Sequence, residues 1–143
     1  MSMHALGAAP EAMLKLVWGI ATKSGITSDA WEPWHTCFKA ATVWPIARKG
    51  KTVGGLLLHG MADGRVMIHL VVKPEWQSKW LNKEIVRAIH GWKPGVDIVA
   101  PVLIDTNREP DAPVRGLEKF ARLAKFRKTA EKMGEYTLFV KES

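Results

Sequence analysis

The stretch that decides the fold covers residues 66–91, which read VMIHLVVKPEWQSKWLNKEIVRAIHG. Its first part, 66–72, is almost wholly apolar and rich in β-branched residues, which is typical of a buried strand. A short polar loop follows over 73–78. Apolar residues then recur at intervals of three to four, and this period predicts a helix over about 79–90 with Gly91 as its stop signal. The segment is therefore predicted to be a strand, a loop and a helix.

Two helices are predicted before this unit, after a loose arm over residues 1–9. The first covers about 10–24, where apolar residues follow the spacing of a buried helical stripe. The second is expected to begin at Ser28 and Asp29, because Asp29 and Glu32 have the spacing of a capping box. We therefore expect a pair of short helices at the start of the chain.

The other predicted elements complete a sheet around the unit at 66–91. An Ala-Asp-Gly turn at 62–64 indicates a hairpin with strand 66–72 as its second arm, and Pro45 places an earlier strand at a sheet edge. In chain order these elements are the edge strand 42–47, the first hairpin strand 53–61, a central strand 96–105, a helix 114–125 and a closing hairpin of 126–133 with 136–141. The order α-α-β-β-β-α-β-α-β-β predicts a single α/β (mixed α+β) domain over residues 1–143.

Composition describes an ordinary soluble globular chain with a basic surface. Of 143 residues, 21 are Lys or Arg and 14 are Asp or Glu, which gives a net charge of +7. This balance favours nucleic acid, an acidic protein surface or a polyphosphate as the partner. No apolar run reaches the roughly 20 residues of a membrane span, no signal peptide is recognisable, and the single Cys37 cannot form an internal disulfide. We therefore expect a cytoplasmic protein.

Common catalytic and metal-binding motifs are missing from the sequence. The five His and one Cys have no metal-ligand spacing, so no metal site is predicted. Neither a nucleophile elbow, nor a Walker loop, nor a dinucleotide-binding GxGxxG occurs. His59 and His69 both fall on the predicted hairpin. Each could act there as a general base, or be one of the more common polar residues of a sheet with no chemical role, and His69 is the candidate base.

The run from Val71 to Asn82 resembles the acyl-CoA motif of the GNAT superfamily of N-acetyltransferases. In that family a strand ends in a Pro-Glu-aromatic step, here Pro74-Glu75-Trp76, and is followed by Arg/Gln-x-x-Gly-x-Gly/Ala and a helix. The predicted order of elements also matches the family over nearly the whole chain. The resemblance implies a GNAT-like central mixed sheet in which strands 66–72 and 96–105 are neighbours that splay apart.

The resemblance also implies which residues would contact an acyl-CoA. They lie at the end of one strand, in the loop after it, and at an Asn that relatives often carry after the next strand: Leu70, Val71, Val72, Gln77, Ser78, Lys79, Trp80 and Asn107. The step Ala124-Lys125-Phe126 stands where relatives often carry Leu-Gly-Phe. These positions are the predicted cofactor site.

Several departures from the family pattern weaken this site. Trp80 replaces the first motif glycine and Asn82 the second, and those glycines let backbone N–H groups approach a pyrophosphate closely. We therefore expect Trp80 to occupy or reshape the pyrophosphate loop. The family's frequent catalytic Tyr maps to Phe120 or Ala121, and its strand-borne Glu is missing. Weak or absent binding of acetyl-CoA is the expected result.

Two functions follow from the resemblance. A Trp at the glycine position is similar to divergent acetyltransferase-like proteins of tailed bacteriophages, some of which resemble small virion proteins. The chain is then a GNAT-fold protein with a decayed acyl-CoA site, a non-catalytic structural or adaptor component of a larger assembly, in a host cytoplasm or a virion. The alternative is an active acetyl-CoA-dependent N-acyltransferase that acts on a primary amine.

Partners are predicted from two surface features. Seven tryptophans exceed what a core of this size should enclose, so Trp31, Trp34, Trp76 or Trp92 should be partly exposed and anchor a protein partner or a second copy. The basic tract 115–128 could contact nucleic acid. The expected core consists of Leu14, Val17, Ile68, Leu70, Ile85, Ile89, Val102 and Ile104.

Overall fold

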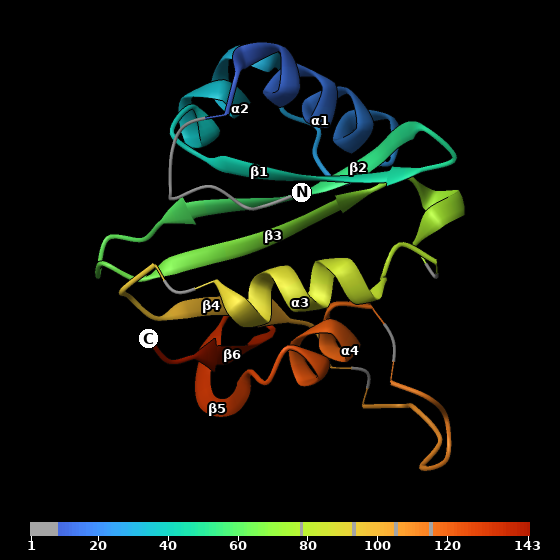
Figure 1. Ribbon diagram of the computed structural model, residues 1–143, viewed down its shortest axis with the longest axis vertical. Helices are drawn as coiled ribbons and strands as arrows, with labels where there is room; N and C mark the ends of the chain where they lie inside the picture. The colour runs from blue at the N-terminus through green and yellow to red at the C-terminus, as the bar shows by residue number, and fades with distance from the viewer. Residues whose placement is uncertain (1–8, 78, 93, 105, 115) are drawn as a thin grey trace.

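The computed structural model describes residues 9–77, 79–92, 94–104, 106–114 and 116–143. Within these ranges six strands form one mixed sheet in the order β1-β2-β3-β4-β6-β5. Helices α1 and α2 lie on one side of this sheet, and α3 and α4 lie on the other (Figure 1). The predicted class, a mixed α+β fold, is confirmed. Residues 1–8 of the predicted arm and Ser78 lie outside the described residues.

The two N-terminal helices are α1 (Glu11–Lys23) and α2 (Trp31–Phe38). The first agrees with its prediction, but the predicted capping box at Asp29 is wrong, because α2 begins after Ala30 and has no side-chain cap. A helix that began at Asp29 would need a hydrogen bond from Pro33 to the Asp29 carbonyl, and proline has no N–H. That carbonyl accepts a hydrogen bond from the Trp18 indole instead, at 3.0 Å.

Three antiparallel strands follow as predicted: β1 (Thr42–Arg48), β2 (Lys51–Gly60) and β3 (Val66–Val72). The first lies at the sheet edge and carries a bulge between Ile46 and Ala47. Gly54 on β2 faces Val72 on β3 so closely that a Cβ at Gly54 would stand 2.1 Å from the Val71 carbonyl oxygen. A side chain at this position would therefore force the two strands apart.

The neighbouring parallel strands β3 and β4 (Ile98–Val102) separate soon after they meet. They pair only at Val66 with Ile98 and Met67 with Val99. The remainder of β3, residues 68–72, has no strand partner on this side within the part of the chain that the structure describes. The predicted splay is confirmed, and it opens a gap near the middle of the sheet.

The remaining elements agree with the prediction in type but are shorter. A 3₁₀ turn, η1 (Pro74–Trp76), precedes α3 (Lys83–Gly91), and α4 (Gly116–Leu123) precedes the closing hairpin of β5 (Arg127–Met133) and β6 (Tyr136–Lys141). The predicted start of α3 at Lys79 is wrong by four residues. Asn82 is the N-cap, and its side chain accepts a hydrogen bond from the Ile85 N–H, which fixes the first turn.

Two apolar layers hold the helices to the sheet. The larger packs α3 and α4 on one face around Leu56, Ile68 and Phe139, and the other packs α1 and α2 on the opposite face around Leu57 and Val71. Six of the eight predicted core residues are buried, and the other two, Leu70 and Ile104, are partly buried against the larger layer. The alternation of Leu56, Leu57 and Leu58 shows that β2 is covered on both faces.

The tryptophans are more buried than predicted. Trp31 and Trp76 are half-buried, as expected, but Trp34 and Trp92 are only 3% and 8% exposed. Trp34 packs inside the α1–α2 layer, and Trp92 packs at the end of α3 in the larger layer. Both positions remove a large apolar surface from water, which composition alone could not locate.

Candidate functional site

A cleft of about 460 Å³ lies where β3 and β4 diverge. Its walls come from β3, from the end of β4, from the start of α4 and from the β5–β6 turn. The residues are Ile26, Ile68, His69, Leu70, Pro101, Val102, Leu103, Gly116, Leu117, Glu118, Met133 and Tyr136. The predicted candidate base His69 and the predicted contact Leu70 therefore share one cavity, here called the splay cleft.

His69 is hydrogen-bonded to His59 on the neighbouring strand. Their Nε2 atoms are 2.7 Å apart, and the planes of the two rings are nearly parallel, with an interplanar angle of 5°. The ring of Phe38 on α2 stands perpendicular to both imidazoles at 5.6 Å. The prediction that both histidines lie on this hairpin is confirmed, and the contact places them on one face of it.

The hydrogen bonds assign the tautomers of the pair. The Gly60 carbonyl can only accept, so His59 Nδ1, 3.1 Å away, carries the proton and His59 Nε2 is an acceptor. His69 Nε2 then donates to it, and His69 Nδ1 keeps a lone pair, with no hydrogen-bond partner among the described residues. Burial, and to a smaller degree the neighbouring His59, lowers the pKa of His69 from 6.5 to about 4. His69 is therefore neutral near pH 7.

Two further titratable side chains line the splay cleft, and the sequence prediction missed both. Glu118 on α4 is only 7% exposed and is paired with Arg122 at 2.9 Å. Tyr136 begins β6 and is 44% exposed. Only the three-dimensional structure places them in the same cavity as His69. In the sequence, burial of Glu118 is indicated by its position among the apolar residues of α4.

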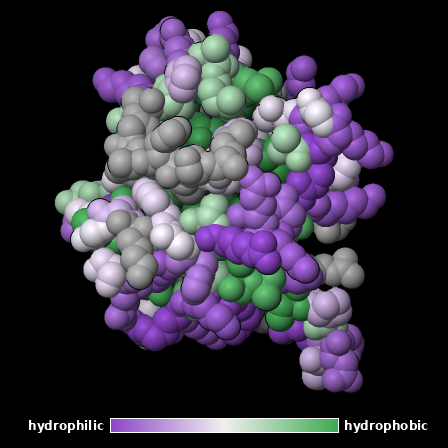
Figure 2. Space-filling view, viewed as in Figure 1, coloured by the Kyte–Doolittle hydropathy of each residue, from purple (hydrophilic) through white to green (hydrophobic). Residues whose placement is uncertain are grey.

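A larger pocket of about 770 Å³, here called the α3–α4 groove, lies between the two helices for which it is named. Its lining combines apolar side chains with the cations Lys83, Arg87 and Lys119, and none of the described residues in it is acidic. The same region shows hydrophobic surface bordered by hydrophilic side chains in Figure 2. Gly116 lines both this groove and the splay cleft, so the two cavities meet at the start of α4.

The loop that would bind a CoA pyrophosphate is held by contacts within the chain. The Asn82 Oδ1 atom accepts the Ile85 N–H at 2.8 Å, which removes one of the free N–H groups at the start of α3. The Arg48 guanidinium donates to the carbonyl oxygens of Lys79 and Trp80. One N–H of the first turn of α3 is therefore occupied, and the loop backbone before it is held by Arg48.

The Trp80 side chain does not lie across this loop. It is 1% exposed and packs in the larger core, with its ring 5.8 Å from that of Phe120. Of the two predicted alternatives, occupation of the loop by the indole does not hold, because the core removes its apolar surface from water, and a reshaped loop backbone stays a prediction. Its buried side chain instead anchors the backbone beside Arg48.

The predicted contact residues separate into different places. Leu70 lines the splay cleft, and Gln77 and Trp80 line the α3–α4 groove. Val71 and Val72 are buried on opposite faces of β3, and Lys79 is exposed between η1 and α3. Asn107 lies in the exposed segment after β4 and lines neither cavity.

The described residues lack both a metal-ligand cluster and a membrane-spanning helix. They contain no cluster of three or more His, Cys, Asp or Glu side chains that could hold a metal ion. None of the described helices has the length and apolar character needed to cross a membrane.

Comparison with known proteins supports the fold. The sequence matches no protein-family model and no curated protein. The structure is similar to the crystal structure of ribosomal-protein-alanine N-acetyltransferase from Brucella melitensis, with a TM-score of 0.62 and 14% sequence identity over 95% of this chain and 98% of that one. The fold is therefore GNAT-like, and at this identity the similarity extends to the fold alone.

Proposed function

We propose that this chain is a GNAT-fold protein with a decayed acyl-CoA site that serves as a non-catalytic structural or adaptor component of a larger assembly, such as a virion. The observation that carries the proposal is the internally bonded loop before α3. Asn82 occupies the Ile85 N–H, and Arg48 fixes two carbonyl groups of the loop. A ligand phosphate would have to displace contacts that the chain already makes.

The chemistry of the splay cleft gives the proposal further support. A base with a pKa of about 4 holds a proton only weakly near pH 7, so His69 is a poor acceptor for an amine proton. Glu118 is already paired with Arg122. Glu118 and the Nε2 atom of His69 are thus engaged with other residues of the chain.

Calorimetric titration with acetyl-CoA tests the proposal without knowledge of any acceptor. The wild-type chain should give no saturable heat, whereas saturable binding at micromolar concentration would contradict the decayed site. The double variant Asn82→Gly/Arg48→Met should gain measurable binding, because it frees the Ile85 N–H and releases the loop. Glycine is tolerated at an N-cap position. Its substitution for Asn82 should lower the stability of α3 by only about 0.3 kcal/mol, so the helix should persist.

Arg127→Met is the control for this titration. Arg127 is paired with Glu142 on the exposed closing hairpin and lines neither cavity, so this variant should give no saturable heat, like the wild type. Trp80→Gly is not a useful variant, because deletion of a buried aromatic side chain typically costs about 3–5 kcal/mol of stability.

A second function is favoured by a specific observation, namely the three titratable residues in the splay cleft. His69 Nδ1 keeps a free lone pair, and Glu118 and Tyr136 line the same cavity. Such a site could take a proton from a primary amine in an acetyl-CoA-dependent N-acyltransferase. Release of free CoA in the presence of amines, lost in His69→Gln and retained in His90→Gln, would favour this alternative.

A further inference from the structure

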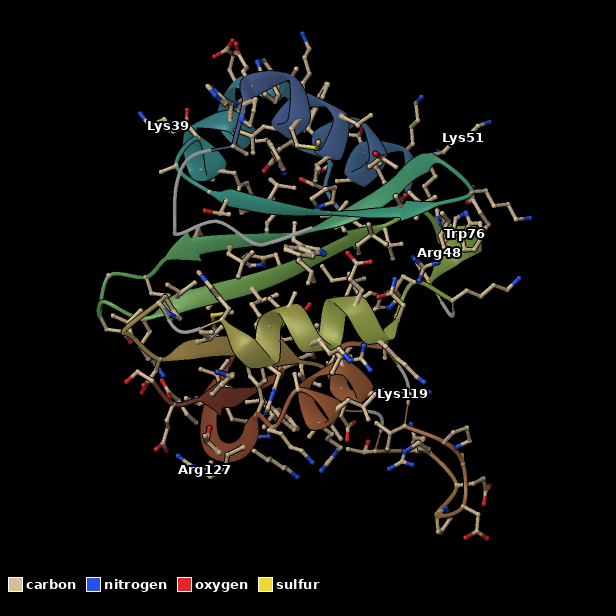
Figure 3. The ribbon with its side chains drawn as sticks, in the orientation of Figure 1. Lys39, Arg48, Lys51, Trp76, Lys119 and Arg127 are labelled. Carbon is tan, nitrogen blue, oxygen red and sulfur yellow. The ribbon has the colours of Figure 1, made fainter. Side chains whose placement is uncertain are left out.

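The excess positive charge of the chain is concentrated on one side of the molecule. Residues 48–51 and 73–87 together with Lys119, here called the basic edge, hold eight of the 21 Lys and Arg but only two of the 14 Asp and Glu. They account for six of the seven net positive charges. Figure 3 shows Lys51, Arg48, Trp76 and Lys119 along this side.

Contacts join the three parts of the basic edge in space. Arg48, at the end of β1, donates to the carbonyls of Lys79 and Trp80, so the β1–β2 turn lies against the loop before α3. Lys83 and Arg87 follow one helical turn apart and line the α3–α4 groove together with Lys119. The edge is therefore a continuous surface from the β1–β2 turn to α4.

Six of the eight cations of this edge are exposed, and Arg48 and Lys73 are half-buried. Lys49, Lys51, Lys79, Lys83, Arg87 and Lys119 form no ion pair with any residue in the part of the chain that the structure describes. By contrast, Arg65, Arg122 and Arg127 outside the edge are all in ion pairs. Like charges gathered without partners repel one another, and a bound polyanion relieves that repulsion.

The structure regroups the basic residues that the sequence placed in one tract. Within 115–128, Lys119 faces the α3–α4 groove, whereas Arg122 binds Glu118 and Arg127 binds Glu142. Arg115 lies outside the described residues. The tract is therefore divided among the basic edge, local ion pairs and the exposed Lys125 and Lys128, and the edge holds more cations than the remainder of the tract.

We propose that the basic edge binds the phosphate backbone of a nucleic acid. A nucleic acid carries regularly spaced charges over an extended length, which matches cations drawn from three separate segments. A protein partner would be expected to need apolar anchors at the centre of its interface. Among the described residues that line the groove, Leu123 alone is a large apolar side chain with strong exposure. Lys and Arg on phosphates read no sequence, so binding is expected to be independent of sequence. This inference does not depend on the proposed function.

The test uses fluorescence anisotropy of a labelled DNA duplex and of one of its strands, titrated with the full chain over a series of salt concentrations. The triple variant Lys83→Gln/Arg87→Gln/Lys119→Gln should weaken binding about tenfold or more and reduce the slope of log K against log salt by about 3. The control Lys39→Gln/Lys125→Gln/Lys128→Gln removes the same charge from other surfaces. It should leave the affinity and the slope near their wild-type values.

Three outcomes would overturn the proposal. They are no binding of either the duplex or the single strand, equal losses in the two triple variants, and displacement of the duplex by polyglutamate of matched charge at equal affinity. The second outcome would mean that only net charge matters, and the third would indicate an acidic protein as partner. Failure of the proposed function would be detected separately, because the acetyl-CoA titration that tests it contains no nucleic acid.

Discussion

Lys125 ends α4 in the left-handed backbone region, with a φ of 69°. The Lys125 and Phe126 N–H groups bond to the Arg122 and Ala121 carbonyls there, as in a helix C-cap. A residue with a Cβ pays a steric penalty of about 1 kcal/mol in this conformation, and glycine does not. Lys125→Gly should therefore raise the free energy of unfolding by about 0.5–1 kcal/mol, measured by urea denaturation.

Lys119→Gly provides the contrast for this prediction. Lys119 lies inside α4, where glycine should lower the free energy of unfolding by about 1 kcal/mol. If Lys125→Gly were also destabilising, this would mean that Lys125 does not adopt the left-handed backbone conformation at the end of α4. The sequence resemblance placed a glycine step at this position, and the backbone explains why a glycine would suit it.

At the residue scale, sequence reasoning located some of the site but could not assign its contacts. The pairing of His59 with His69 follows from strand alternation, which can be read from the sequence. The direction of the Trp80 side chain depends on the space left by Phe120 in the core, and no local pattern encodes that. Glu118 and Tyr136 reach the splay cleft from elements far away in the sequence, so only the fold reveals them.

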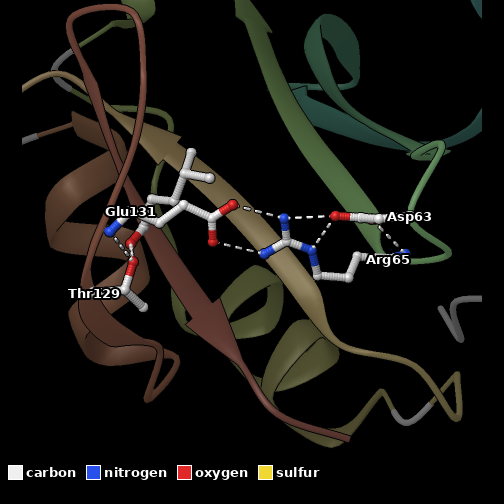
Figure 4. Close-up of polar contacts among 5 residues, drawn as sticks. Asp63, Arg65, Thr129 and Glu131 are labelled. Carbon is white, nitrogen blue, oxygen red and sulfur yellow. Dashed lines mark hydrogen bonds and ion pairs between the residues drawn. The ribbon is translucent and has the colours of Figure 1, made fainter.

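At the element scale, a polar network ties the β2–β3 turn to the edge strand β5 (Figure 4). Arg65 donates two hydrogen bonds to Glu131, at 3.0 and 2.9 Å, and one to Asp63 at 2.8 Å. These bonds lower the pKa of the Glu131 carboxyl below its usual value. Glu131 sits in a bulge of β5, where its N–H donates to Thr129 Oγ1, so the bulge aims the carboxylate at Arg65.

Glu131→Gln should loosen the closing hairpin, because Arg65 would lose its charged partner across the sheet. We expect faster hydrogen exchange of the β5 and β6 amides and a lower Tm at low salt, with the difference from wild type shrinking as salt rises. Glu142→Gln removes a similar but strongly exposed pair with Arg127 and should change little. Equal effects of the two variants would mean that the Arg65 network does not hold β5.

Element types and their order could be predicted because each segment has a clear apolar period. Boundaries were less accurate where one residue decides them. Pro33 delays the start of α2, and the Asn82 cap delays the start of α3. Such shifts depend on hydrogen bonds that form only when distant groups, such as the Trp18 indole, are in place.

At the scale of the whole molecule, the diverging strands β3 and β4 open the sheet and carry His69 at the margin of the gap. The histidine pair lies where α2, β2 and β3 meet, since Phe38 packs against both imidazoles. A charge on His69 would therefore destabilise its packing against α2 as well as against the sheet. Global stability should report on its protonation.

Stability should fall as the pH decreases from about 6.5 to about 4, because His69 in the unfolded chain takes a proton at its ordinary pKa while the folded chain resists protonation down to a pKa of about 4. The stabilising contribution is complete above pH 6.5 and is lost as the pH falls to 4. It amounts to roughly 3 kcal/mol.

Protonation of carboxyl groups such as Glu131 also lowers the free energy of unfolding at low pH. The effect of His69 is therefore isolated by comparing wild type with His69→Gln by urea denaturation at each pH. The variant should show a flatter profile between pH 6.5 and 4, while His90→Gln, an exposed histidine on α3, should follow the wild type. Parallel profiles for wild type and His69→Gln would show that the folded chain binds the proton as readily as the unfolded one.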